Sequence, residues 1–302
     1  MKIFINRTNE NWICDRLTQE WYDNNAEIVS NYIDDADILW LMSSWNWKSI
    51  PKFILEEKKV VTTIHHLVPE KVDILDFENR DKITDLYHVP CQKTKDQVKS
   101  LTKKPIKVIP FWANSALWRP VDNKTELRKK YGFPEEAFII GSFQRDTEGS
   151  DLRSPKLEKG PDIFCDIVEK LYAKNKNIQV CLAAWRRQYV IGRLEKRKIK
   201  YNYFRLCDNF MMNELYNMID LYIISSRYEG GPQSIIEGGL CGTPIVSTDV
   251  GLAEHFLDPQ SIYTDMSDFT NAKPNPEFTL QKIKKICIPH GMAPFRSMFE
   301  SL

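Results

Sequence analysis

The sequence lacks an excess of charge of either sign. Its 302 residues include 42 lysines and arginines against 41 aspartates and glutamates, which gives a formal net charge of +1. Proteins that bind nucleic acid are usually more basic, so this balance argues against such a partner. The content of 42% hydrophobic and 27% charged residues is typical of a globular protein, and the length allows two domains.

Long apolar runs are also lacking. The N-terminus, residues 1–7, turns polar after three apolar residues, which is too short for the core of a signal peptide. No later run approaches the roughly 18 residues that a membrane-spanning helix needs. We therefore expect a cytoplasmic protein with no stable membrane insertion.

Closely spaced cysteine pairs are absent. The seven cysteines are odd in number and widely spaced, and none belongs to a C-x-x-C pair. This pattern predicts reduced, mostly buried thiols and argues against disulfides or a zinc site.

Glycine is missing from the first 131 residues, whereas seven of the eight tryptophans lie within the first 118. This contrast predicts two domains, residues 1–118 and 119–302. In both halves strand-like and helical segments alternate, which is typical of parallel sheets with helices on both faces. We expect strands at 2–6, 37–42, 60–65, 86–89, 106–111, 138–143, 178–184, 203–206, 221–226 and 244–248. We expect helices near 11–23, 49–58, 92–102, 160–173, 187–198, 211–219 and 232–240, with further helical spacing at 280–287 and 295–302.

The segment 225–237 is the most informative part of the chain. An apolar run at 221–224 is typical of a buried strand, and Gly230 and Gly231 then allow backbone angles closed to other residues. Pro232 suits the first turn of a helix. The backbone N–H groups of that turn would face outward with the positive end of the helix dipole, which favours a phosphate; they belong to Gln233, Ser234 and Ile235.

Two carboxylates flank this turn. Glu229 precedes the expected helix and Glu237 lies about a turn and a half inside it. An anion site flanked by carboxylates is typical of a sugar phosphate, because hydroxyls need acceptors while the phosphate needs donors. A capped helix with two solvated glutamates is the simpler alternative.

Over about residues 137–257 the sequence resembles the C-terminal half of the retaining GT-B glycosyltransferases of family 4. The resemblance rests on I-I-G-S-F-Q-R at 139–145, E-K-G-P-D at 158–162, N-E-L-Y-N at 213–217, the glutamates 229 and 237, and C-G-T-P-I-V-S-T-D-V-G at 241–251. It implies an α/β protein with a GT-B fold, in which two Rossmann-like parallel-sheet domains face each other across a cleft. It also implies that the last helix crosses back to the first domain.

The resemblance implies roles for individual residues. Arg145 and Lys159 match the basic pair that holds the donor diphosphate, whose charge grows as the glycosidic bond breaks. Glu229 matches the glutamate that contacts the transferred sugar, and Glu237 matches the one that accepts from the ribose hydroxyls. The same turn adds three donor-binding positions: Gly231, Ser234 and Ile235.

The sequence departs from the family pattern between the basic pair. Typical members separate the two positions by about six residues, whereas residues 146–158 intervene here. Lys156, in this longer loop, is therefore an alternative to Lys159, and the loop either orders over the donor or forms a longer surface loop. Arg186 and Arg187, after the strand at 178–184, either reach the nucleotide or begin a solvated helix.

The first half carries weaker matches. His65 matches a histidine that these enzymes place close to the donor sugar, so the implied catalytic set is Glu229, His65, Arg145 and Lys159. The glycine-rich loop that commonly follows the first strand is missing, and residues 6–11 occupy its place. Trp45 and Trp47 are candidates for stacking on an acceptor, with core packing as the alternative, whereas Trp40 is expected in the core.

A metal site is not expected. Asp35 and Asp37 satisfy a D-x-D pattern, but they precede their strand and so lie at the wrong edge of the sheet. The sequence thus predicts a metal-independent, cofactor-free glycosyltransferase that moves a sugar from a nucleoside diphosphate sugar to a hydroxyl acceptor, such as a saccharide or lipid-linked saccharide. The alternatives are a phage-type nucleobase glycosyltransferase, in which tryptophans hold a flipped base, and a GT-B relative that binds a nucleotide sugar or glycan without turnover.

Overall fold

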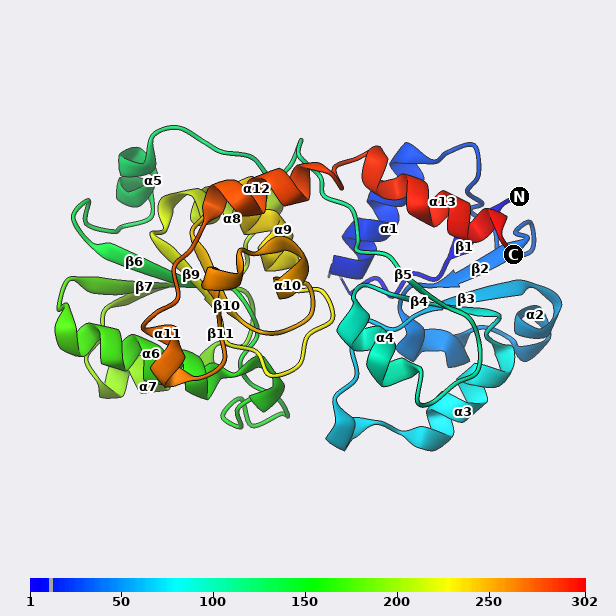
Figure 1. Cartoon of the computed structure of the whole chain (residues 1–302), viewed down its shortest axis with the longest axis horizontal. Helices are drawn as coiled ribbons and strands as arrows, with labels where there is room; N and C mark the ends of the chain where they lie inside the picture. The colour runs from blue at the N-terminus through cyan, green and yellow to red at the C-terminus, as the bar shows by residue number, and fades with distance from the viewer. Residues whose placement is uncertain (11–12) are drawn as a thin grey trace. The chain divides into compact units, whose positions relative to one another are not determined.

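The computed structural model describes residues 1–10 and 13–302 and forms two compact units (Figure 1). Unit 1 comprises Met1–Trp112 and Pro289–Leu302, and unit 2 comprises Ala113–Ile288. The boundary between the units therefore lies at residues 112–113, a few residues before the boundary at 118–119 that the sequence suggested. The last segment, Pro289–Leu302, belongs to unit 1. Trp12 and the start of the helix expected at 11–23 lie outside the described residues.

Unit 1 is built on a parallel sheet whose strands lie in chain order, β1-β2-β3-β4-β5. The strands are β1 (Ile3–Ile5), β2 (Ile38–Leu41), β3 (Lys59–Thr63), β4 (Leu86–Val89) and β5 (Ile106–Val108). The helices are α1 (Ile13–Asn24), α2 (Lys52–Glu57), α3 (Ile74–Ile83), α4 (Gln92–Val98) and α13 (Ala293–Glu300), with 3-10 turns η1 (Ser44–Ser49), η2 (Pro69–Lys71) and η5 (His290–Met292).

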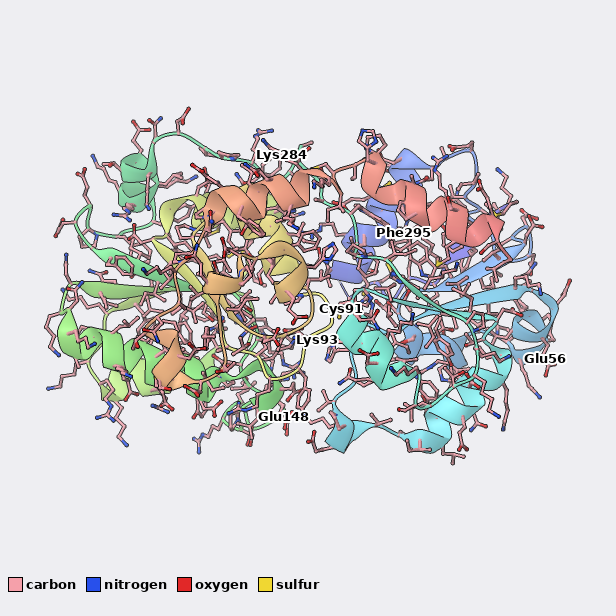
Figure 2. The ribbon with its side chains drawn as sticks, viewed as in Figure 1. Glu56, Cys91, Lys93, Glu148, Lys284 and Phe295 are labelled. Carbon is pink, nitrogen blue, oxygen red and sulfur yellow. The ribbon has the colours of Figure 1, made fainter. Side chains whose placement is uncertain are left out.

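The two faces of this sheet have different cores, because successive side chains of a strand point to opposite faces. On β2, Leu39 and Leu41 join an aliphatic cluster with α2. Trp40, between them, points to the other face and is fully buried there, so the expected core position is confirmed. Its ring lies 5.4 Å from the ring of Phe295, which belongs to α13 and is labelled in Figure 2.

Unit 2 contains a six-stranded sheet in the order β11-β10-β9-β6-β7-β8. Its strands are β6 (Phe138–Ser142), β7 (Ile178–Ala183), β8 (Tyr201–Phe204), β9 (Leu221–Ile224), β10 (Ile245–Thr248) and β11 (Ile262–Tyr263). Its helices are α5 (Lys124–Lys130), α6 (Pro161–Lys174), α7 (Gln188–Lys196), α8 (Asn209–Met218), α9 (Gln233–Leu240), α10 (Ala253–Phe256), α11 (Met266–Phe269) and α12 (Pro276–Lys284), with η3 (Leu157–Lys159) and η4 (Pro259–Ser261).

The order of the strands in unit 2 creates a switch point. From β6 the chain first builds outward through β7 and β8, and then returns to the other side of β6 with β9. All described pairings in this sheet are parallel, so the carboxyl ends of β6 and β9 meet at one edge. In open α/β sheets this is where ligands bind, because the loops that leave the two strands diverge and leave a crevice.

Each strand and helix expected from the alternation is present, with ends that differ by a few residues. The expected parallel sheets are therefore confirmed. All seven cysteines are unpaired, and five of them are buried. Among the helices of the described residues, none has the length and apolar content that a bilayer span requires.

Candidate functional site

The switch point of unit 2 brings three sequence-predicted residues together. Arg145 follows β6, Lys159 ends η3 just before α6, and Glu229 follows β9. The Nζ atom of Lys159 lies 2.5 Å from Oε1 of Glu229, and both side chains are largely shielded from solvent. The proposed phosphate-binding cation and the proposed sugar-facing carboxylate are thus in direct contact.

Two neighbouring polar residues hold this pair in place. The side-chain amide of Gln144 donates to the carbonyl oxygen of Lys159 at 2.8 Å. The hydroxyl of Ser226 lies 3.3 Å from both Gln144 Oε1 and Glu229 Oε1. The sequence analysis assigns no role to Gln144 or Ser226, although Gln144 directly follows the strand expected at 138–143 and Ser226 ends the strand expected at 221–226.

Close backbone packing shapes the site. Gly160 caps α6 with a φ of +59°, and a Cβ atom there would overlap the carbonyl oxygen of Ser225. Gly251, with a φ of +53°, packs so closely on the 229–230 turn that a Cβ atom would lie 2.6 Å from the Gly230 oxygen. Only glycine fits both positions. Gly230 and Gly231 do not have positive φ angles, which differs from the expectation. The glycine that packs on this turn with a positive φ is Gly251.

Arg145 is held by the loop that follows it. Its Nε donates to the carbonyl oxygen of Thr147 at 2.7 Å, and the side chain is half-buried. Among the described residues, none accepts from its two terminal nitrogens in a hydrogen bond of ordinary geometry. Burial, together with the nearby cation of Arg186, lowers the pKa of Arg145.

Lys156, the alternative to Lys159, lies in the same cationic region. Its Nζ is 3.3 Å from Oε1 of the buried Glu158. Burial lowers the pKa of Lys156, and the positive charges of Lys159 and Arg145 act in the same direction. Arg145, Lys156 and Lys159 thus form a cluster of positive charge, and a bound polyanion would stabilise such a cluster.

The start of α9 differs in one respect from the expectation. The N–H group of Ile235 donates to the carbonyl oxygen of Pro232 at 2.9 Å, so it is not an outward-facing donor. Among the described residues, no backbone oxygen accepts from the N–H groups of Gln233 or Ser234, and these two remain available at the helix terminus.

Glu237 lies deeper than Glu229. Its side chain is buried in α9, and its Oε2 accepts a hydrogen bond from the Tyr216 hydroxyl at 3.1 Å. Glu229 is thus in contact with a lysine cation, and Glu237 accepts from a phenol hydroxyl. These partners suit Glu229 for a position near a developing charge and Glu237 for accepting hydrogen bonds from neutral hydroxyls.

His65 and the two candidate tryptophans lie in unit 1. The His65 ring is stacked on Phe111 at 5.7 Å, and its Nε2 lies 2.9 Å from the carbonyl oxygen of Met42. Trp45 is about half exposed and its ring lies 6.0 Å from that of His65. Trp47 packs against the aliphatic core and donates from Nε1 to Asp76, so it is the weaker candidate for stacking on a ligand.

Arg187 does not fit either interpretation made from the sequence. Its side chain is fully buried, and its Nε lies 3.1 Å from Oδ2 of Asp146, which is buried as well. It is therefore neither a solvated residue at the start of a helix nor a group that reaches a ligand. Nothing in the sequence predicts this pair, because its members are far apart in the chain and residues of both types are usually exposed.

The D-x-D residues precede β2, as expected. Oδ2 of Asp37 accepts from the N–H group of Lys2 at 2.8 Å. Among the described residues there is no group of three or more His, Cys, Asp or Glu side chains arranged to hold a metal ion.

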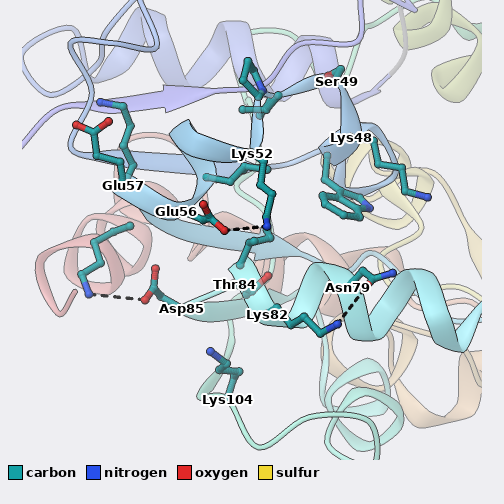
Figure 3. A pocket seen from close by; sticks show the side chains of 17 residues that line it. Lys48, Ser49, Lys52, Glu56, Glu57, Asn79, Lys82, Thr84, Asp85 and Lys104 are labelled. Atoms are coloured by element: carbon teal, nitrogen blue, oxygen red, sulfur yellow. Dashed lines mark hydrogen bonds and ion pairs between the residues drawn. The ribbon is translucent and has the colours of Figure 1, made fainter.

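A pocket with a volume of about 850 Å³ lies elsewhere, in unit 1 between α2 and α3 (Figure 3). Several lysines line it, but Lys52 is paired with Glu56 at 3.2 Å and Lys59 with Asp85 at 3.6 Å. Lys82 donates to Asn79. The pocket lies in unit 1, whereas the cation cluster around Arg145 lies in unit 2.

Comparisons with known proteins agree on the fold. Residues 152–272 match the family model described as glycosyl transferases group 1, which is less than half of the chain. The comparison with curated proteins gives no match.

Solved structures are similar over the whole chain. HepE of Anabaena in complex with UDP-glucose is 14% identical with a TM-score of 0.77, and the match covers 100% of this chain and 99% of that one. Sucrose-phosphate synthase from Thermosynechococcus elongatus is 14% identical with a TM-score of 0.69, covering 98% and 81%. A glycosyltransferase from Rickettsia africae is 14% identical with a TM-score of 0.65, covering 98% and 83%. With its two parallel sheets, the chain has the GT-B fold.

Proposed function

We propose that this protein is a glycosyltransferase that moves a sugar from a nucleoside diphosphate sugar to a hydroxyl acceptor. The observation that carries the proposal is the contact between Lys159 and Glu229 beside Arg145, at the switch point of a GT-B unit. A phosphate needs cations and N–H donors, and a sugar needs acceptors. This edge of the sheet supplies both. The match to the glycosyl transferases group 1 model over 152–272 supports the same activity.

The chemistry follows from the charges. As the glycosidic bond breaks, negative charge collects on the departing diphosphate, where Arg145, Lys159 and the N–H groups at the start of α9 would stabilise it. Positive charge develops at the anomeric carbon, where Glu229 would stabilise it. We propose retention of configuration by a front-face route, in which the departing phosphate accepts the proton of the acceptor hydroxyl. We also propose that no metal ion is needed, because protein cations bind the diphosphate.

The donor and acceptor contacts complete the proposal. Glu237 would accept hydrogen bonds from the ribose hydroxyls, and His65 would bond to a hydroxyl of the transferred sugar. HepE was crystallised with UDP-glucose and with UDP, so a uridine nucleotide is the first donor to test. Trp45, exposed next to His65, is the better of the two candidates for stacking on a saccharide acceptor.

A panel of UDP-, GDP- and ADP-sugars tests the proposal. Slow hydrolysis of one donor, detected as released nucleoside diphosphate, is expected even without an acceptor. Calorimetric titration with that nucleoside diphosphate should give binding that Arg145→Ala weakens by about 10-fold or more, because a charge-assisted contact contributes roughly 1.5 to 3 kcal/mol. Unchanged affinity in the variant would refute the assignment of Arg145. Tight binding without turnover of any donor would favour the non-catalytic alternative.

A further inference from the structure

A buried ion pair lies directly beside the proposed phosphate-binding arginine. Asp146, the residue after Arg145, is 1% exposed, and its partner Arg187 is 0% exposed. Besides the contact of 3.1 Å between them, Asp146 accepts from the backbone N–H groups of Tyr189 and Val190 at 3.3 Å. A carboxylate at this depth is stable only when it is paired and hydrogen-bonded in this way.

Arg187 connects this carboxylate to the sheet. Its Nη1 donates to the carbonyl oxygens of Ser142 at 2.6 Å and of Ala183 at 3.2 Å, and its Nη2 donates to the Ser142 hydroxyl at 3.0 Å. These oxygens lie at the ends of β6 and β7. The Arg187 guanidinium therefore connects the ends of both strands to Asp146, the residue where the 146–158 loop begins.

The loop is ordered as a hairpin on this base. Thr147 and Pro155 form an antiparallel bridge, and the N–H group of Glu148, labelled in Figure 2, donates to the Ser154 carbonyl at 3.0 Å. The hairpin closes where the Lys156 N–H group donates to the Asp146 carbonyl at 2.8 Å. The 146–158 loop is thus ordered by its own backbone hydrogen bonds.

The hairpin in turn orients Arg145. The Thr147 carbonyl, one residue beyond the buried Asp146, accepts from Nε of Arg145 at 2.7 Å. With Nε held, the planar guanidinium can rotate little, and its terminal nitrogens keep one direction. A fixed guanidinium loses less conformational freedom when it binds a phosphate through two parallel hydrogen bonds.

We propose that the Asp146–Arg187 pair positions Arg145 for the donor diphosphate, through the hairpin whose Thr147 carbonyl holds the guanidinium. Asp146 and Arg187 are then positioning residues of the donor site and do not touch the ligand. The inference rests on the proposed function, because it takes a nucleoside diphosphate as the ligand of Arg145.

A double-mutant cycle with Arg145→Ala and Asp146→Asn separates positioning from general stabilisation. The ligand is whichever of UDP, GDP and ADP the wild-type protein binds best in calorimetric titration. Asp146→Asn should weaken its binding about 10-fold in the wild-type background and by less than about 2-fold in the Arg145→Ala background, because residues that act as a unit are not additive. Equal effects in both backgrounds, or none, would overturn the inference and leave the proposed function standing.

A matched control comes from the other end of β6. Arg128 Nη2 lies 2.6 Å from Oδ2 of Asp220, which also accepts from the Ile139 N–H group at 2.8 Å. Asp220→Asn should lower the midpoint of urea unfolding but leave nucleotide affinity within about 2-fold of wild type. A loss of affinity equal to that of Asp146→Asn would show a general effect of lost stability and overturn the inference.

If Asp146→Asn does not fold, Arg187→Lys takes its place in the cycle. Lysine keeps the buried charge but cannot make the forked contacts to Ser142 and Ala183. Its effect on affinity should again vanish in the Arg145→Ala background, and persistence there would contradict the positioning role. Absence of nucleotide binding in the wild-type protein would overturn the proposed function and this inference with it.

Discussion

Lys159 and Glu229 neutralise each other across the carboxyl edge of the second sheet, with 2.5 Å between Nζ and Oε1. A donor diphosphate at this edge would compete with Glu229 for the lysine. Binding would then weaken the contact between Glu229 and Lys159 and would place the sugar of the donor beside the Glu229 carboxylate. In the proposed reaction the pair would thereby couple the binding of the leaving group to the release of the Glu229 oxygen that interacts with the sugar.

Glu229→Gln keeps the size of the side chain and removes its charge. Turnover of the donor should collapse, because no carboxylate remains to stabilise positive charge at the anomeric carbon. Nucleoside diphosphate affinity should survive, since Lys159 loses a competing partner. Steady-state kinetics and calorimetric titration of the same preparation measure the two effects, and full turnover in the variant would contradict the assigned role.

Glu237→Gln should behave differently. The ribose hydroxyls would lose a charged acceptor in the ground state and the transition state alike, so the change should appear mainly as a higher KM with little change in kcat. Tyr216→Phe is a useful companion, because it removes the hydroxyl that Glu237 accepts from without touching the carboxylate. If Glu229→Gln and Glu237→Gln altered kcat and KM in the same way, the division of roles would be wrong.

Activity should persist in the presence of a chelator. The proposed site neutralises the diphosphate with Arg145, Lys159 and the start of α9, and Asp37 is engaged by a backbone N–H group. Turnover in EDTA should therefore match that of the untreated enzyme. Loss of turnover that magnesium or manganese restores would return Asp35 and Asp37 to consideration as ligands.

Stability should depend on pH through His88. Its Nε2 lies 2.8 Å from the Ile109 carbonyl and its Nδ1 lies 3.0 Å from the Thr63 hydroxyl, which accepts from the Trp40 indole. The carbonyl can only accept, so Nε2 carries the proton and Nδ1 accepts from Thr63. This buried neutral ring has a pKa lowered to about 3, chiefly by desolvation.

The sign of the pH effect follows from this pKa. Below pH 6.5 the unfolded chain binds a proton at His88 that the folded unit excludes until about pH 3. As the pH is lowered from 6.5 to about 3, the free energy of unfolding should therefore decrease by about 1.4 kcal/mol for each pH unit, from this group alone. Urea unfolding followed by tryptophan fluorescence measures it, since six of the eight tryptophans lie in unit 1. His88→Gln should flatten the slope, and the exposed His290→Gln should not.

The local pattern around residues 221–240 predicted strand, turn and helix because the controlling interactions lie within a few residues of each other. The apolar run formed β9, and α9 began one residue after Pro232. Only the family resemblance assigned Lys159 and Glu229 to one site, because their separation of 70 residues in the chain does not predict a contact.

Features that depend on distant partners escaped the sequence. Helix α3 (Ile74–Ile83) was missed because its apolar residues Ile74 and Leu75 are exposed and do not form a clear stripe. The pairing of Asp146 with Arg187 depends on the fold that buries both side chains. Ile235 was expected to offer a free N–H group, but in the first turn of α9 this group donates to the Pro232 carbonyl oxygen.

The return of the chain to unit 1 determines the order in which the protein can be completed during synthesis. Unit 2 occupies the continuous stretch 113–288 and can fold once that stretch has emerged from the ribosome. Unit 1 is translated first, yet its aromatic core needs Phe295 and Phe299, which pack on Trp21 and Trp40. A chain that ends before α13 would therefore leave aromatic side chains exposed in unit 1, the part that is synthesised first. Such premature products would expose a surface on which aggregation begins.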